Sequence, residues 1–346
     1  MSQPIGLADI QDFVASTQLE YGPPSFRQIA QDLTRFEIFS RWFREDKVMI
    51  EEGRGVERQV MLEYDEGEIH TTDYAEDSVD FDDVMDKVQV NWVKAKVGWH
   101  LHYDEVNENR GGAALFNIIQ SRRASKMLKI AKGIETGGWG VPASSADTIH
   151  PWGVKFWCVK NSTRGFTGGL PSGHSTLAGI DLDEHDNFKN WSNPYTDVSR
   201  GDLIFKMREA RMETDFVSPL EVGGEGNVIM DTYRTYVNNE TYLNLQMKME
   251  DQNENLGPDV GRTAAGNLAF NGNPVVAVPY LNDDSSDPVY MLCHDVFKVI
   301  VQSGNFLRES EVIRSSKNSD LYVVFITLKY NYICTDRRRL AVLYKA

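Results

Sequence analysis

Cysteine is scarce in this chain of 346 residues, which contains only Cys158, Cys293 and Cys334. The three are isolated in the sequence, their number is odd, and none belongs to a C-x-x-C motif. This pattern gives no disulfide framework and no cysteine-based metal site, and it fits a reducing compartment. We therefore predict three free thiols buried in the core.

Positive charge is in deficit: 36 Lys and Arg residues stand against 51 Asp and Glu residues, which sets the formal net charge at −15 and the isoelectric point near 5.0. Nonspecific binding to DNA depends on Lys and Arg side chains that release counterions from phosphates. Tight binding to nucleic acid is therefore not expected. The hydrophobic fraction of 41% is ordinary for a folded protein, and the length allows two or three compact units.

Long hydrophobic runs are also missing. No window of the sequence approaches the roughly 18 apolar residues that a membrane-spanning helix needs. The first residues, MSQPIGLADIQDF, lack the basic and apolar regions of a signal peptide. We therefore predict a soluble protein that is made in the cytoplasm and has no membrane partner.

The common catalytic motifs are absent as well, because the chain contains no GxxxxGK[ST], no GxGxxG after a strand and no HExxH. One metal-binding alternative stays open, since His100, His102 and Asp104 would share a face of a strand and their side chains are metal ligands. Hydrogen bonding between these polar neighbours is the preferred interpretation, and we expect no cofactor. The missing motifs favour a structural protein over an enzyme.

Two helices are predicted where apolar residues recur at helical spacing. The first covers residues 26–44, with Ser25 as its N-cap after a proline pair. The second covers residues 108–132, with Gly133 at its C-terminal end. Four basic side chains share one polar face of the second helix: Arg122, Lys126, Lys129 and Lys132.

Between these helices, residues 45–105 are predicted to form an extended hairpin, because apolar and polar residues alternate along 88–92 and 97–103. Its tip is acidic. Between residues 63 and 86 there are eleven acidic residues and no Lys or Arg: Glu63, Asp65, Glu66, Glu68, Asp73, Glu76, Asp77, Asp80, Asp82, Asp83 and Asp86. An isolated hairpin is marginally stable in water, so this projection implies a docking surface elsewhere. A solvated acidic loop on a monomer is the alternative.

The rest of the chain predicts a mixed domain followed by C-terminal strands. Residues 134–270 are rich in Gly, Asn, Pro and aromatic residues, with a strand at 154–159 and a helix beginning after Ser199. Apolar strands follow at 274–280 and 289–294, joined by an acidic turn. The last segment, LYVVFITLKYNYICTDRRRLAVLYK, predicts a strand pair whose basic tip is Arg337, Arg338 and Arg339.

This order of elements resembles the tailed-phage major capsid protein of the Hong Kong 97 type. The segments PWGVKFWCVKNSTRGFTGGLP, FKNWSNPYTDVSRGDL and NGNPVVAVPYLNDDSSDPVYML are similar to those of phage and prophage capsid proteins. The resemblance covers nearly the whole chain. It implies an α+β fold and a structural protein that self-assembles into the icosahedral head shell of a tailed double-stranded DNA phage and encloses the genome.

The resemblance also implies a division of the chain. Residues 1–44 would be an N-terminal arm and helix, and residues 45–107 an E-loop that reaches over a neighbouring subunit. The peripheral domain would combine 108–145, including a long spine helix, with 270–346, and the axial domain would be 146–269. Nothing in the sequence marks the Lys–Asn pair of the type member, so covalent crosslinking is not predicted.

The partners that the resemblance implies are further copies of this chain, arranged as hexamers and pentamers. Scaffold, portal and decoration proteins are additional candidates, and packaged double-stranded DNA would be near the shell without specific binding. The location would be the virion, after assembly in the host bacterial cytoplasm.

Charge complementarity predicts how the subunits would meet. The acidic side of the contact would come from the hairpin tip: Glu66, Asp77, Asp80, Asp82 and Asp83. The basic side would come from an adjacent subunit: Arg122, Lys126, Arg337, Arg338 and Arg339. Two other classes stay open, namely an encapsulin-like nanocompartment shell protein of the same fold and an unrecognised soluble α+β metal-dependent enzyme.

Overall fold

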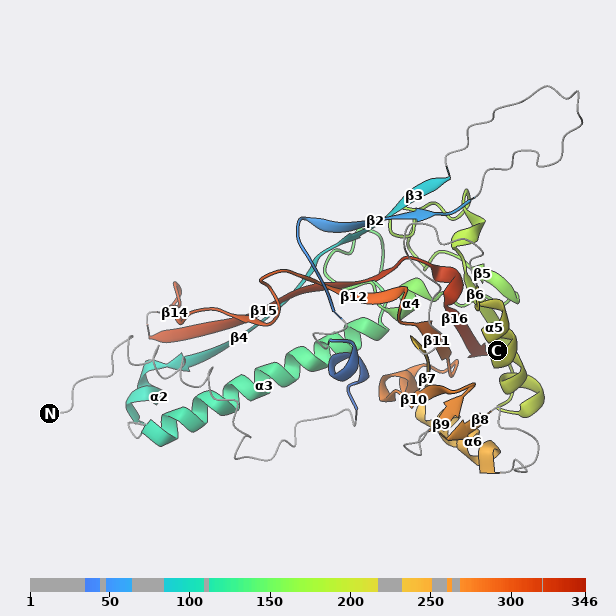
Figure 1. Ribbon diagram of the computed structural model, residues 1–346. Coiled ribbons are helices and arrows are strands. Elements are labelled where there is room, and N and C mark those ends of the chain that lie inside the picture. Colours follow the sequence, from blue (N-terminus) through green and yellow to red (C-terminus); the bar gives the residue numbers. More distant parts are fainter. Residues whose placement is uncertain are drawn as a thin grey trace, which may run out of the picture.

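The computed structural model describes residues 35–43, 48–63, 84–108, 112–216, 232–250, 260–262, 268–318 and 320–346. These residues form a projecting hairpin, a long sheet beside a long helix, and a second sheet with shorter helices (Figure 1). The three cysteines are free and buried, as predicted. Among the described residues, no helix has the length and apolar character needed to cross a membrane.

The hairpin predicted for residues 45–105 is confirmed only for strands β2 (Gly55–Met61) and β3 (Met85–Asn91), because the strands Met49–Glu51 and Val93–His102 of that range pair within the long sheet instead. Strand β2 pairs antiparallel with β3, so that Val56 lies opposite Val90. Alternate side chains are buried, as the period of two requires. The acidic tip at 64–83 lies outside the described residues.

The long sheet has six strands. Strand β15 (Leu321–Cys334) is its centre, and it pairs antiparallel with β4 (Val93–His102) on one side and with β12 (Phe297–Gln302) on the other. Strand β12 also pairs in parallel with β1 (Met49–Glu51). The short strands β13 (Arg308–Glu309) and β14 (Ile313–Arg314) pair with the first part of β15. Strand β4 therefore lies at an edge of this sheet.

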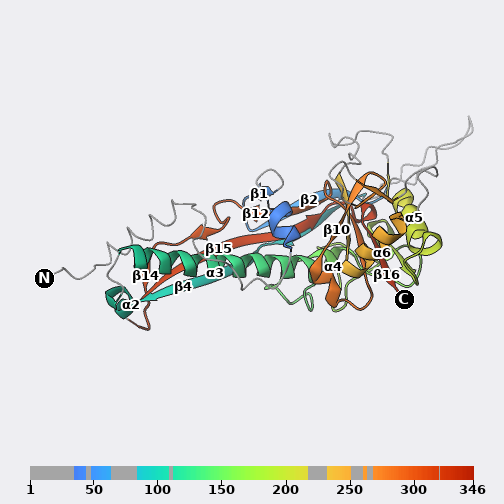
Figure 2. The ribbon, with the colours of Figure 1, turned by 90° about the horizontal axis from the view of Figure 1, so that it is seen from below.

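Helix α3 (Gly112–Trp139) runs beside β4 and β15 for most of their length in both views (Figures 1 and 2). The prediction that this helix begins at residue 108 and ends at Gly133 is wrong. A separate helix α2 (Tyr103–Glu108) precedes it, and α3 continues through Gly133 to Trp139. Packing explains the extension, because Trp139 is fully buried and its capture stabilises the last turns more than a solvent-exposed glycine weakens them.

The second sheet has eight strands in the order β5-β6-β16-β11-β7-β10-β9-β8. Their bounds are Gly165–Gly168, Asn190–Tyr195, Ala341–Lys345, Val289–Cys293, Tyr233–Val237, Asn273–Ala277, Leu268–Phe270 and Val260–Arg262, in the same order. Helix α5 (Phe205–Glu213) packs against β6 and β16, and helix α6 (Asn239–Glu250) packs against β10. A π-helical turn, Arg200–Ile204, leads into α5 after Ser199, where a helix start was predicted.

Three local predictions are wrong. Residues 154–159 were expected as a strand, but α4 (Val154–Trp157) is helical, because Val154, Phe156 and Trp157 are all buried and helical geometry satisfies that demand in one turn. A continuous helix over 26–44 is also wrong, since helical structure in the described segment starts only near Ile38–Trp42, a π-helical turn. Residues 26–34 lie outside the described part. The C-terminal strands are not a pair, because β15 and β16 belong to different sheets.

Residues 270–346 contribute to both sheets. Strands β12 and β15 belong to the long sheet, whereas β10, β11 and β16 belong to the eight-stranded sheet. The boundary between the sheets therefore does not coincide with the division at residue 270 that the resemblance implies. One large hydrophobic cluster joins the hairpin, the long sheet and α3, and a smaller one fills the space under α5 and α6.

Candidate inter-subunit surfaces

Arg337 is fully buried in the short 3₁₀ turn Arg337–Arg339 that joins β15 to β16. Its guanidinium group donates hydrogen bonds of 2.8–3.3 Å to five oxygen atoms: the carbonyls of Trp157, Phe188, Gly168 and Gly169 and the side chain of Asn190. Burial lowers the pKa of Arg337 to about 10, which leaves it charged at neutral pH. The prediction of an exposed basic tip is wrong for this residue, because it joins loops of its own subunit.

The two following arginines also contact their own subunit. Arg339 is nearly buried, and its Nε lies 3.1 Å from the Oδ2 atom of Asp336. The guanidinium carbon of Arg338 lies 4.2 Å from the ring centroid of Phe216, and the side chain is half-buried. Cation–π stacking of this kind holds Arg338 near the surface, where a further contact with a neighbour stays a prediction.

Arg122 forms a two-point pair with Glu105 of helix α2, which follows β4. Its Nη atoms lie 2.8 and 2.7 Å from the Glu105 oxygens, and Nη1 also donates to the carbonyl of His100. This side-chain hydrogen bonding lowers the pKa of Glu105 to about 2. Arg122 therefore holds α3 against β4 within one subunit. Lys126, one turn further along α3, is half-buried and its predicted contact with a neighbour is untested.

A loop from the middle of the chain holds the described end of the hairpin that is next to its tip. His185 Nδ1 lies 3.0 Å from Glu63 Oε1, and the amide of Asn187 donates to the carbonyl of Leu62. The backbone N–H of Gln89 donates to the carbonyl of Ala178 over 2.7 Å. The acidic residues of the tip, Glu66, Asp77, Asp80, Asp82 and Asp83, lie outside the described residues. Their pairing with a neighbour stays a prediction.

The three residues of the metal-binding alternative do not form a strand face. His100 and His102 are on β4, but Asp104 is in helix α2. The backbone N–H of Asp104 donates to His102 Nδ1 over 3.3 Å, so these polar neighbours form a local hydrogen bond. Within the described ranges, no group of three His, Cys, Asp or Glu side chains is placed to hold a metal ion.

The sequence offered no signal for the contact that anchors residues 37–43. Glu135, buried on α3, accepts hydrogen bonds from the backbone N–H groups of Glu37, Ile38 and Phe39 at 3.2, 2.8 and 3.3 Å. It also accepts one from Trp139 Nε1 at 2.9 Å. These are the N–H groups at the start of a helical turn, which have no partner within the turn itself.

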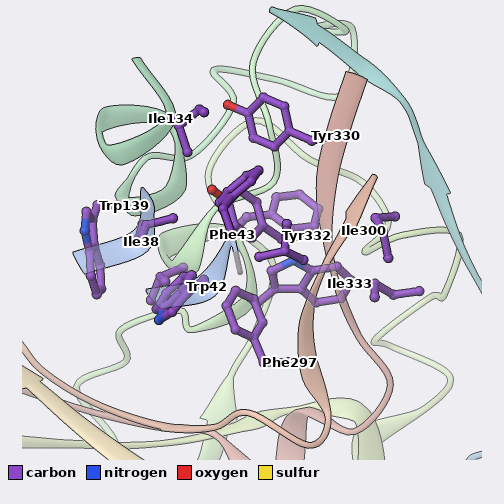
Figure 3. Close-up of a cluster of buried hydrophobic side chains, with 14 of the residues drawn as sticks. Ile38, Trp42, Phe43, Ile134, Trp139, Phe297, Ile300, Tyr330, Tyr332 and Ile333 are labelled. Carbon is purple, nitrogen blue, oxygen red and sulfur yellow. The ribbon is translucent and has the colours of Figure 1, made fainter. Parts of the chain in front are cut away.

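Trp42 completes this anchor by entering an aromatic cluster (Figure 3). Its indole N–H donates to Tyr236 Oη over 3.0 Å, and its ring packs against Trp139, Phe297 and Tyr332. The cluster draws on α3, β7, β12 and β15, which are far apart in the sequence. Trp42 therefore attaches the described end of the N-terminal region to both sheets.

Glu37 adds a charged contact beside the cluster. The residue is buried, and its carboxylate lies 3.2 Å from Arg35, 3.2 Å from Arg41 and 3.8 Å from Arg234. Arg234 is on β7 of the second sheet. A buried carboxylate surrounded by cations in this way fixes the position of the turn relative to that sheet.

No protein-family model and no curated protein matches this chain, but solved structures do. The capsid asymmetric unit of cyanophage A-1(L) is 12% identical with a TM-score of 0.58, and the match covers 94% of this chain and 97% of that chain. The capsid of a native GTA particle is 9% identical with a TM-score of 0.53, covering 95% and 96%. The holo-SrpI encapsulin complex from Synechococcus elongatus PCC 7942 is 9% identical with a TM-score of 0.49, and the match covers 96% of this chain and 94% of that chain.

The chain therefore has the α+β fold of Hong Kong 97-like capsid proteins, and the fold predicted from the sequence is confirmed. The similarity extends over almost the full length of both chains, so the hairpin, the long helix and both sheets are all parts of that fold. At 9–12% identity it is a similarity of fold.

Proposed function

We propose that this chain is the major capsid protein of a tailed double-stranded DNA phage, which self-assembles into an icosahedral head shell and encloses the genome. The observation that carries the proposal is the match to a phage capsid subunit over 94% of this chain and 97% of the other. A domain inserted in an unrelated protein would leave part of one chain unmatched. The coverage of both chains therefore supports a role in a shell for all of the matched residues.

The parts of the chain have distinct roles in this proposal. Residues 1–44 act as the N-terminal arm, and residues 45–107 act as an E-loop over a neighbour. Residues 146–269, which contribute to the eight-stranded sheet, form the axial domain. Residues 108–145 and much of 270–346 form the peripheral domain. The anchor formed by Glu135 and Trp42 supports the first of these roles, because it holds the base of the arm rigidly. Each contact between subunits can have a modest affinity, since many such contacts act together in a shell.

The net charge of −15 suits an enclosing shell. A surface that does not bind phosphates tightly allows packaged DNA to move and leave. In this proposal the protein has no enzymatic role, it is located in the virion capsid, and assembly takes place in the host bacterial cytoplasm. Scaffold, portal and decoration proteins are expected as further partners.

Negative-stain electron microscopy of the purified protein, together with its mass from light scattering, tests the proposal. Closed shells, or rings of five or six subunits, would support it. A monodisperse species of 39.2 kDa at every concentration and with added lysate proteins would count against it. A matched variant, Trp42→Ala, should fail to assemble under the same conditions, because it releases the base of the arm.

A further inference from the structure

Strand β4 presents an open edge. One side pairs with β15 over ten residues, and within the described part of the chain no strand pairs with the other side. The backbone of its even-numbered residues points to that open side, since the carbonyl of His100 accepts from Arg122 and the N–H of His102 donates to Glu105. Three residues of the same parity precede them on the strand: Lys94, Lys96 and Gly98. Their backbone groups form a template on which another strand can pair.

A cleft of about 830 Å³ lies along this edge, between β4 and the second half of α3. Apolar side chains form much of its wall: Val93, Ala95, Val97, Ile130, Ile134 and Tyr330. Four of its 19 lining residues are lysines and none is acidic: Lys94, Lys96, Lys129 and Lys132. In a protein with a net charge of −15, this local composition favours an occupant that is both acidic and partly apolar.

The two kinds of side chain on β4 are sorted onto opposite faces of the strand. Trp99 and the other odd-numbered residues lie on the face that α3 covers. The even-numbered lysines lie on the other face, where Lys96 Nζ is 3.8 Å from the centre of the Phe325 ring. Lys94 lies directly opposite Lys329 of β15, a like-charged pair that is unfavourable by itself. Among the described residues, no carboxylate lies within ion-pair distance of these three lysines.

One segment of this chain has the complementary pattern. Residues 64–83 hold nine acidic residues and no Lys or Arg, and residues 79–82 read Val-Asp-Phe-Asp. In an extended strand, alternation would place Val79 and Phe81 on one face and Asp80 and Asp82 on the other. That is the same sorting of apolar and charged residues as on β4, with the charge reversed.

We infer that residues 79–82 of a second copy of this chain add as a strand to the open edge of β4. The apolar pair enters the cleft beside α3, and the two aspartates lie next to Lys94 and Lys96, which border the cleft at the edge of the strand. Strand addition supplies backbone hydrogen bonds, and the alternating side chains determine the register. The inference rests on the proposed function and identifies the surface of one subunit that receives the hairpin tip of the next.

Charge reversal is the first test. The double variant Lys94→Glu/Lys96→Glu should lose closed shells and rings in electron microscopy, and adding Asp80→Lys/Asp82→Lys to the same chain should restore them. The control, Arg54→Glu/Lys317→Glu, makes the same change of charge at two exposed residues outside the cleft and should assemble normally. Normal assembly of the Lys94/Lys96 variant would overturn the inference and leave the proposed function intact.

Disulfide trapping tests the register. Two residues that lie side by side on paired strands, with their side chains on the same face, are close enough for a disulfide. Ala95→Cys with Val79→Cys or Phe81→Cys should therefore give covalently linked dimers and higher multimers on oxidation. Ala95→Cys with Asp80→Cys is the control, because the two thiols would lie on opposite faces and should not link. The native cysteines are buried and do not compete.

The outcomes of trapping separate the two proposals. Linked multimers that follow the odd-numbered pattern support the inference. Shells without links, equal linkage for all pairs, or links only within one chain overturn it while leaving the capsid proposal standing. A wild-type protein that stays monomeric at all concentrations overturns both.

Discussion

Removing the carboxylate of Glu135 should detach residues 37–43 from the body of the subunit. This side chain is buried and accepts four hydrogen bonds, three from the backbone of Glu37, Ile38 and Phe39 and one from the indole of Trp139. Glu135→Ala leaves all four donors without that acceptor. Glu135→Gln keeps the shape and one acceptor oxygen, but it turns an NH₂ group toward N–H donors.

The magnitude follows from the number of stranded donors. Each buried group left without a partner costs about 1–3 kcal/mol, and neighbouring losses do not add fully. We expect Glu135→Ala to lower the free energy of unfolding by about 3–5 kcal/mol, because four buried donors lose their acceptor together. Glu135→Gln should cost about 1–3 kcal/mol, since part of the acceptor capacity remains.

The pH dependence of the Gln variant has a definite sign. Burial raises the pKa of Glu135 above its ordinary value of 4.5, and its hydrogen bonds oppose that shift. A carboxyl group with a higher pKa in the folded state binds a proton more readily when the protein is folded. Its contribution to the free energy of unfolding is therefore complete below pH 4.5, the ordinary pKa, and is lost as the pH rises through the folded-state pKa. The stability deficit of Glu135→Gln should therefore be larger at acidic pH than at neutral pH.

Urea unfolding of the unassembled subunit, followed by tryptophan fluorescence, measures these differences. Trp42 and Trp139 are two of the seven tryptophans and pack together with ring centroids 5.5 Å apart, so part of the signal comes from the anchor. Glu57→Gln, on the exposed side of the hairpin, is the matched control and should stay within about 0.5 kcal/mol of the wild type. A Glu135→Ala protein as stable as this control would refute the reasoning.

Four further variants test the packing of the subunit, each by urea unfolding. Gly138→Ala places a Cβ atom against the side chain of Ile38 and should cost about 1–3 kcal/mol. Gly133→Ala meets nothing within 4 Å and should stabilise α3 by about 0.5–1 kcal/mol, so equal effects of the two changes would contradict the packing argument. Arg337→Met removes five hydrogen bonds to neutral oxygen atoms and should cost about 3–5 kcal/mol, since buried acceptors lose a donor. An unchanged midpoint would show that the guanidinium makes no net contribution to stability. Trp42→Ala should cost about 3–5 kcal/mol and remove the near-ultraviolet circular dichroism of the aromatic cluster, and a retained spectrum would disprove that Trp42 organises it.

Sequence periodicity predicted the elements that obey a local rule. The hairpin strands β2 and β3 and the edge strand β4 alternate apolar and polar residues because one face of each is buried, and this period is visible in a single stretch of chain. The long helix was predicted for a similar reason. Its true end was not, because the capture of Trp139 depends on residues such as Trp42 and Tyr236 that are remote in the sequence.

The candidate site shows the same division. The acidic character of residues 63–86 and the alternating lysines of β4 are properties of the sequence alone. That β4 is an open edge beside a cleft depends on which strands pair with β15, and no local pattern encodes that choice. Arg337 shows the contrast most clearly. Three consecutive arginines predict an exposed basic tip, but the structure buries Arg337 completely.

The sequence by itself therefore determined the charge balance, the free cysteines, the alternation of the hairpin and the resemblance that predicted the fold. Tertiary structure alone decided which charges are available to a neighbour. Carbonyl groups from separate loops converge on Arg337 and bury it, whereas Lys94 and Lys96 are exposed. The physical reason is that a side chain is buried by residues that are distant from it in the sequence, so no short segment of the chain determines its burial.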